Sequence, residues 1–258
     1  MGIIVFMNRI SKLLAKLQSK NCLKTIAGIN NFNKSKVLQL VKISEITGAD
    51  CVDISADPEI ISSALKIVKN TALMVSSIVP AELKMAQELG CDAVELGNYE
   101  ALHLEGIYPS KDQVLAWATE IMNFKKSVLV SVTIPGHLSV DEQVALAIEL
   151  DEMGVDIIQT EGADLAVAKS PSALGQIEKV SITLANTIEI ARNISNAFIL
   201  TASGLSPETV KLAIAAGASG VGVGKFINRL ESEIEQMAAI KSLQEALEGT
   251  VQIAQATR

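Results

Sequence analysis

Aromatic residues make up only 3% of this 258-residue chain, and acidic residues outnumber basic ones, giving a net charge of −7. Proteins that bind nucleic acids usually present a basic surface, often with aromatic side chains for base stacking. Both features are scarce here, so we expect no nucleic-acid partner. Apolar runs are also short of the ~20 residues that a membrane helix needs. We therefore expect no membrane partner.

Cysteine and histidine are also rare. Cys22, Cys51 and Cys91 form no CxxC pair, and each lies at or just before an expected strand. We interpret them as buried, reduced thiols, with no disulfide or zinc site. Of the two histidines, His137 follows an expected strand, where it is either an acid-base group or an ordinary capping or exposed residue. His103 is read as ordinary, and we assign no metal ligands.

Strand-like and helix-like segments alternate along the whole chain, which is 49% hydrophobic. The expected strands cover residues 23–28, 51–56, 72–78, 93–98, 127–134, 156–162, 198–204 and 220–224. Strands that alternate with helices pair in parallel, in a closed barrel or an open doubly wound sheet. We expect one domain over residues 1–258. It comprises an extra N-terminal helix at 8–20, the strand-and-helix body at 23–248 and a flexible tail at 249–258.

Four similar segments favour the closed barrel: GADCVDIS from 48, GCDAVELG from 90, GVDIIQTE from 154 and GASGVGVG from 217. Each begins with a glycine that ends a helix and then enters a strand. They occupy every second strand, which suits a (β/α)8 barrel built from related quarters. A doubly wound sheet has no reason to show this repeat. The sequence therefore predicts a TIM barrel.

The same repeat predicts which side chains face the interior, because successive residues of a strand point to opposite faces. One phase is apolar and suits contact with the outer helices: Val52, Ile54, Val94, Leu96, Ile158, Val221 and Val223. The other phase puts Asp53, Glu95, Gln159 and Gly222 in one interior layer. It puts Ser55, Gly97, Glu161 and Gly224 in the next layer, nearer the C-terminal mouth.

Such an interior is unusually polar, because barrels are normally filled by Val, Ile and Leu. Buried carboxylates need a cation, a metal or a proton among them. We interpret Asp53, Glu95 and Glu161 as catalytic candidates in a pocket. The alternatives are a register slip that puts these acids on the outer surface and a self-satisfied internal ion network. A magnesium ion held by these three acids stays open, since that ion prefers oxygen ligands.

Lys24 is a fourth catalytic candidate whose orientation the sequence leaves open. It lies in LKTIAG, where either Lys24 or Thr25 can face inward. An inward lysine suits Schiff-base or proton-transfer chemistry. A position low in the barrel, paired with Asp53 or Glu95, is the alternative.

The stretch GVGVGKF at 220–226 indicates a phosphate site. It is no P-loop, since Ser219 and Phe226 stand where that motif needs glycine and Ser or Thr. Gly222 and Gly224 clear space inside the barrel, and Lys225 begins a short helix. TIM barrels often bind phosphate with the loops after strands 7 and 8. Ser203 and Gly204 follow strand 7, so we expect them, with Gly222, Gly224 and Lys225, to hold a small phosphorylated ligand. The alternative is that the glycines serve packing and Lys225 points to solvent.

Two further expectations concern surfaces. The segment at 162–179 is long for a strand-to-helix connection, which is typical of lids over a barrel mouth. Amphipathic outer helices leave room for a homo-oligomer without setting a subunit number.

The motifs IAGINNF, VDISADPE, VELGNYE, IIQTEG, LGQIEK and ASGLSPETVKLAIAAGASGVGVG resemble the twenty-third hypothetical-chloroplast-reading-frame family of red-algal plastids and cyanobacteria. The resemblance covers about residues 10 to 248. It implies a single TIM barrel in the plastid (chloroplast) stroma of an alga or the cytoplasm of a cyanobacterium, with no established activity. The end of the chain also resembles phosphate-binding barrels such as thiazole synthase and indole-glycerol-phosphate synthase. Those usually carry a double glycine where this chain has Ser203-Gly204.

Three functions follow as hypotheses. The first is an enzyme acting on a small phosphorylated metabolite by isomerisation, aldol-type cleavage or condensation. The second is a ligand-sensing barrel without catalysis. The third, an oxidoreductase with flavin mononucleotide (FMN) at the phosphate site, is disfavoured by the few aromatics and by the lack of an evident cation for the flavin ring.

Overall fold

Eight parallel strands close into a barrel in the computed structural model, which describes residues 2–162 and 172–256. Each strand pairs with the next, and β1 pairs with β8. The strands are β1 Cys22–Ile26, β2 Cys51–Ser55, β3 Ala72–Ser77, β4 Ala93–Leu96, β5 Leu129–Ile134, β6 Ile157–Thr160, β7 Phe198–Ala202 and β8 Gly220–Val223. The predicted TIM barrel and its eight strands are confirmed.

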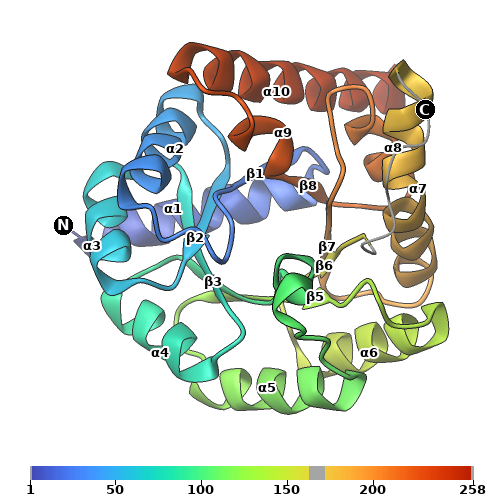
Figure 1. Cartoon of the computed structure of the whole chain (residues 1–258), viewed down its shortest axis with the longest axis horizontal. Coiled ribbons are helices and arrows are strands. Elements are labelled where there is room, and N and C mark those ends of the chain that lie inside the picture. The colour runs from blue at the N-terminus through green and yellow to red at the C-terminus, as the bar shows by residue number, and fades with distance from the viewer. Residues whose placement is uncertain (1, 163–171, 257–258) are drawn as a thin grey trace.

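Helices surround the barrel (Figure 1). They are α1 Gly2–Gln18, α2 Lys34–Thr47, α3 Pro58–Ile67, α4 Pro80–Leu89, the 3-10 helix η1 Tyr99–Glu105, α5 Lys111–Phe124, α6 Val140–Met153, α7 Ser172–Ala191, α8 Val210–Ala215, α9 Lys225–Asn228 and α10 Glu233–Ala256. Helix α10 runs through Ala256 and so includes residues 249–256 of the segment expected as a tail. Residues 163–171 of the expected lid lie outside the described residues.

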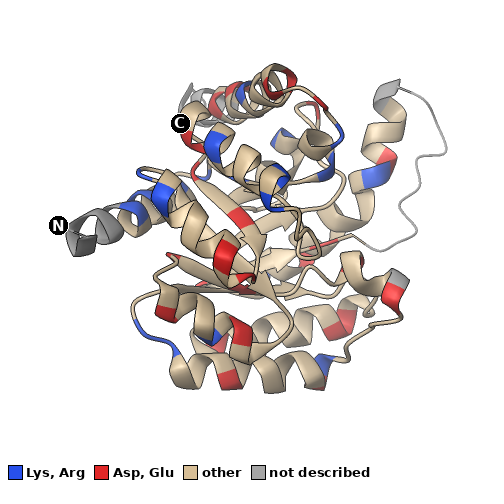
Figure 2. Cartoon of the chain, turned by 60° about the vertical axis from the view of Figure 1, so that its left-hand side comes forward, with Lys and Arg blue, Asp and Glu red and all other residues tan. Residues whose placement is uncertain are grey.

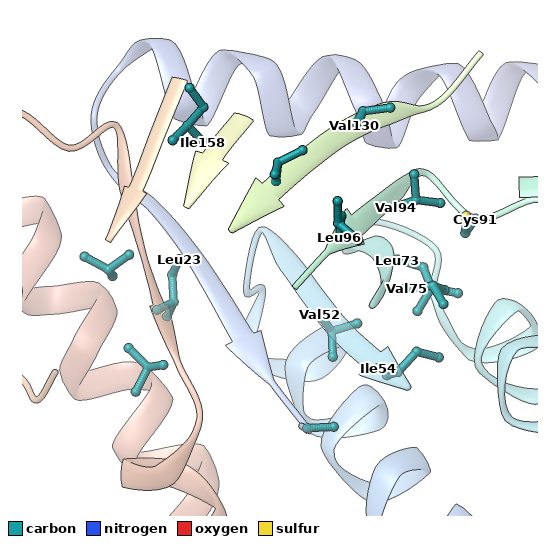
Figure 3. Close-up of a cluster of buried hydrophobic side chains, with 14 of the residues drawn as sticks. Leu23, Val52, Ile54, Leu73, Val75, Cys91, Val94, Leu96, Val130 and Ile158 are labelled. Atoms are coloured by element: carbon teal, nitrogen blue, oxygen red, sulfur yellow. The ribbon is translucent and has the colours of Figure 1, made fainter. Parts of the chain in front are cut away.

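The apolar phase of the strands packs outward against the helices, as predicted. Leu23, Val52, Ile54, Val94, Leu96 and Ile158 are buried in one cluster with helix residues (Figure 3). Burying aliphatic side chains stabilises the fold by roughly 1.5–3 kcal/mol each. Acidic and basic residues are interspersed over the outer helices in the view of Figure 2.

Helix α1 covers the N-terminal end of the barrel. Leu13 and Leu17 are each 1% exposed and pack against a second buried cluster that includes Met74 and Leu129. Figure 1 shows α1 passing behind the strands. This end of the barrel interior is thus filled by apolar side chains.

Three of the four repeated segments have an aspartate as their third residue; the fourth has Ser219. Each aspartate accepts a hydrogen bond from a backbone N–H of the preceding strand. The pairs are Leu23 N to Asp50 Oδ2 (2.9 Å), Leu73 N to Asp92 Oδ2 (2.8 Å) and Val130 N to Asp156 Oδ2 (2.7 Å). The glycines two residues earlier (Gly48, Gly90 and Gly154) end α2, α4 and α6 in the left-handed conformation, which costs glycine little. The repeat therefore fixes strand register at the closed end.

Candidate functional site

A buried polar layer crosses the middle of the barrel. Lys24 points inward, because the next residue, Thr25, faces outward and its hydroxyl bonds Ser44 of α2. Lys24 Nζ lies 2.7 Å from Glu95 Oε2, and both side chains are fully buried. Ser131 Oγ donates to the same carboxylate oxygen at 2.7 Å. The sequence left the direction of Lys24 open; in the structure its side chain points inward and forms an ion pair within the barrel.

The other carboxylate of this layer is Asp53. It accepts hydrogen bonds from Ser76 Oγ and, at 3.5 Å, from Asn98 Nδ2. Asn98 also donates to Glu95 Oε1 at 3.0 Å, and so it links the two acids. Gln159 Nε2 donates to the same Glu95 oxygen at 3.1 Å. Asp53, Glu95 and Gln159 therefore share one layer, as the phase predicted.

Charge in this layer is balanced locally. Burial lowers the pKa of Lys24, but the charges of Glu95 and Asp53 outweigh burial and raise that pKa above its ordinary value. Lys24 is consequently an ammonium group that Glu95 holds, which makes it a poor nucleophile. Burial raises the pKa of Asp53 to about 7, with Lys24 opposing the rise and Glu95 adding to it.

Above this layer, at the C-terminal mouth, lies a cavity of about 630 Å³. Six of the nine predicted site residues line it: Glu161, Ser203, Gly204, Gly222, Gly224 and Lys225. Lys24, Asp53 and Glu95 lie beneath it and are absent from its described lining. The structure thus separates the predicted residues into a cavity group and a supporting layer.

Glu161 is the predicted acid that lines the cavity. It follows β6 and is only 2% exposed, yet it lines the cavity. Its carboxylate oxygens accept backbone N–H bonds from Glu100 and Gly136, both at 3.3 Å. Burial nonetheless raises the pKa of Glu161 to about 8. At neutral pH the group is mostly protonated and can donate a proton to a bound molecule.

The ends of β7 and β8 form the other wall. Ser203 (φ 73°) and Gly204 (φ 72°) both have left-handed backbone, which is unusual for serine. Gly224 precedes α9, and a Cβ at Gly224 would lie 3.1 Å from the Ile26 carbonyl oxygen. Helix α9 has four residues, so its dipole adds little. Any anion here would depend on side chains and on local N–H groups.

The sequence did not indicate several polar residues of the lining, among them Asn98, Glu100, Lys179 and Arg229. Asn98 and Glu100 follow β4, and Lys179 and Arg229 lie on α7 and just after α9. Lys225 Nζ lies 2.7 Å from Glu100 Oε1, and Ser203 Oγ donates to Glu100 Oε2 at 2.7 Å. The position of Asn98 and Glu100 just after a strand's carboxyl end was the available signal, because those ends meet at the mouth.

The two histidines lie beside each other rather than in the polar layer. His103 stacks on Tyr108 with ring centroids 4.4 Å apart, and His137 meets both rings edge-on at 5.4 Å. His137 Nε2 is 3.1 Å from the Pro109 carbonyl oxygen. Cys22, Cys51 and Cys91 are free and buried, as expected.

Residues 2–162 and 172–256 contain no group of three His, Cys, Asp or Glu side chains that is arranged to hold a metal ion. Both oxygens of Glu95, one of the acids considered for magnesium, accept bonds from side-chain donors. Within the same ranges no helix is long and apolar enough to cross a membrane.

Comparison with known proteins gives the family. Residues 7–253 match the family described as "Protein of unknown function (DUF561)". The chain belongs to this family. It is 32% identical over 245 residues to the uncharacterized protein ycf23 of Porphyra purpurea, covering 95% of this chain and 92% of that protein. The protein of the same name from Cyanophora paradoxa is 33% identical over 229 residues, covering 88% and 93%. The resemblance seen in the sequence is confirmed.

Solved structures share the fold at low identity. The 3-hexulose-6-phosphate synthase of Salmonella typhimurium has a TM-score of 0.64 at 13% identity, covering 89% of this chain and 99% of that one. The geranylgeranylglyceryl phosphate synthase of Thermoplasma acidophilum, solved with sn-glycerol-1-phosphate, has a TM-score of 0.58 at 16% identity, covering 92% and 97%. At such identity the likeness establishes the TIM barrel alone.

Proposed function

We propose that this family member is an enzyme that acts on a small phosphorylated metabolite. The phosphate would bind between the ends of β7 and β8, at Ser203, Gly204, Gly222, Gly224 and Lys225. The cavity of about 630 Å³ supports this, because it falls in the ordinary range for small-molecule sites. One structurally similar barrel was solved with its substrate sn-glycerol-1-phosphate, and another is named a 3-hexulose-6-phosphate synthase, which fits the same proposal.

The observation that carries the proposal is that one cavity is lined both by a proton donor and by groups that can bind an anion. Glu161, protonated at neutral pH, lines the same space as the Ser203 hydroxyl and the Lys225 ammonium. A substrate held by its phosphate at one end would present its other end to a proton donor. Such an arrangement suits isomerisation, aldol-type cleavage or condensation, in which an oxygen of the substrate gains or loses a proton.

Lys24, Asp53 and Glu95 take a supporting role in this proposal. They lie beneath the cavity, and the two acids hold Asn98, which lines it. Lys24 is paired with Glu95 at 2.7 Å, so the geometry disfavours a Schiff base at Lys24. The relatives are algal proteins, and we propose the plastid stroma, or the cytoplasm in a cyanobacterium, as the place of action.

The test is a panel of sugar phosphates and other phosphate monoesters, first for binding and then for turnover. With a substrate found, Glu161→Gln should lower kcat by about 10²–10⁴-fold while changing substrate affinity little. Glu161→Asp keeps the acid and should recover part of the rate. Unchanged turnover in Glu161→Gln would remove Glu161 from the mechanism.

A ligand-binding barrel without catalysis is the second candidate. It is favoured by the local pairing of Lys24 with Glu95, which satisfies these charges without a substrate. Binding of phosphate esters with no turnover of any of them would select this candidate.

A further inference from the structure

Two of the side chains proposed to bind phosphate, Lys225 and Ser203, already bind an anionic group of the protein itself, the Glu100 carboxylate. Glu100, on η1, places one carboxylate oxygen 2.7 Å from Lys225 Nζ and the other 2.7 Å from Ser203 Oγ. Ser203 follows β7 and Lys225 follows β8, so the two donors come from the two neighbouring strand ends that form this wall. A carboxylate and a phosphate accept the same hydrogen bonds from the same donors. Glu100 therefore lies where a ligand anion would bind.

The contact is weak enough to exchange. The Lys225 side chain is 87% exposed, and exposed ion pairs contribute only about 0–1 kcal/mol. The backbone at Glu100 is better held, because Tyr99 is fully buried and the Glu100 N–H donates to Glu161. Release of the carboxylate thus needs a side-chain rotation and no movement of η1.

We propose that Glu100 is an internal competitor for the anion site and that a phosphate ligand binds by displacing its carboxylate from Lys225 and Ser203. This rests on the proposed function, since it concerns the same site. Because the Glu100 carboxylate is attached to the chain, it competes with a ligand at a high effective concentration. A monoanionic ligand offers no more charge than Glu100 does. The site therefore selects dianionic phosphate monoesters over carboxylates and neutral sugars.

The experiment is a titration of inorganic phosphate, followed by calorimetry, into the wild type and Glu100→Gln. The glutamine keeps the size of the side chain and removes its charge. We expect about fivefold tighter phosphate binding in Glu100→Gln, because the competent fraction of the site rises. Glu105→Gln is the matched control: it removes the same charge from the same helix, at a residue whose partner is Asn30. It should change the affinity by less than about 1.5-fold.

A double-mutant cycle with Lys225→Met tests whether Glu100 competes with phosphate through its contact with Lys225. If Glu100 competes through Lys225, the gain from Glu100→Gln should fall below about twofold in the Lys225→Met background. Glu100→Asp, whose shorter side chain reaches both donors less well, should give an intermediate gain. It also serves if the glutamine variant fails to fold.

The outcomes separate the two proposals. Phosphate binding that depends on Lys225 but is unchanged or weaker in Glu100→Gln overturns the competitor and makes Glu100 a positioning residue. No phosphate binding in the wild type or in Glu100→Gln overturns the phosphate site itself, and the proposed function with it.

Discussion

The Lys24 ammonium lies 2.7 Å from the Glu95 carboxylate, and both side chains are fully buried. Removing one partner of such a pair leaves an uncompensated charge in the interior, which typically costs about 3–5 kcal/mol. We expect Lys24→Met to lower the free energy of unfolding by that amount in urea titrations. Lys34→Met, in the exposed pair with Glu59, should cost less than about 1 kcal/mol. Equal effects of the two variants would refute a buried charge pair.

Glu161 should give the stability a pH dependence of known sign. Its pKa is about 8 in the folded protein against an ordinary value of 4.5. Between these values the folded state holds a proton that the unfolded chain has lost. The free energy of unfolding therefore falls as pH rises, by up to about 1.4 kcal/mol per pH unit.

Glu161→Gln tests this, because glutamine does not titrate. In urea titrations from pH 4.5 to 9, we expect the variant to gain stability relative to the wild type as pH rises to about 8, and then to stay level. The contribution of Asp53 is present in both proteins and cancels. Parallel stability curves would show that Glu161 ionises at its ordinary pKa.

Ser203 has a left-handed backbone with φ 73°, which costs a non-glycine residue roughly 1–2 kcal/mol. Ser203→Gly and Ser203→Ala both remove the hydroxyl that contacts Glu100, but only glycine relieves the backbone. The glycine variant should therefore be more stable than the alanine variant by about 1 kcal/mol, measured by thermal unfolding. Both should bind phosphate more weakly than the wild type. Greater stability of the alanine variant would contradict this backbone conformation.

Leu17 tests the role of α1 as a cover for the closed end of the barrel. Its side chain is 1% exposed, so Leu17→Ala should cost about 2–5 kcal/mol in urea titrations. Ile46→Ala on α2, where the side chain is 57% exposed, is the control and should cost less than about 1 kcal/mol. A small effect at Leu17 would mean that α1 is loosely attached.

Much of the fold was predictable because the repeated segments alternate polar and apolar residues, which shows which side chains face the barrel interior. Asp53, Glu95 and Gln159 alternate with valine, leucine and isoleucine on strands of known order, so their inward direction followed from the period of two. Strand β1 lacks that contrast, and the direction of Lys24 needed the structure. The amphipathic pattern of α1 shows an apolar face but not which end of the barrel it covers.

The site was less predictable, because its contacts join distant segments. Glu100 and Lys225 are 125 residues apart, and nothing local to either residue specifies the other. Lys225 was expected to meet a ligand, or else solvent; its contact with Glu100 depends on how η1 is placed over the mouth. Asn98 and Glu100 lie in a segment without helix or strand periodicity, and only their position just after β4 indicated that they lie at the mouth.

The most direct test of the phosphate site is a thermal-shift titration with inorganic phosphate and sugar phosphates. It compares the wild type with Gly224→Asp and Gly224→Ala. Both variants add a Cβ that would lie 3.1 Å from the Ile26 carbonyl oxygen, but only aspartate adds a negative charge. A ligand at 100 times its Kd should stabilise the wild type by about 2.7 kcal/mol, or ~5–10 °C in Tm. We expect that shift in the wild type, a smaller one in Gly224→Ala and none in Gly224→Asp. An equal shift in all three proteins, or none with any phosphate in the folded wild type, would contradict a phosphate site between β7 and β8.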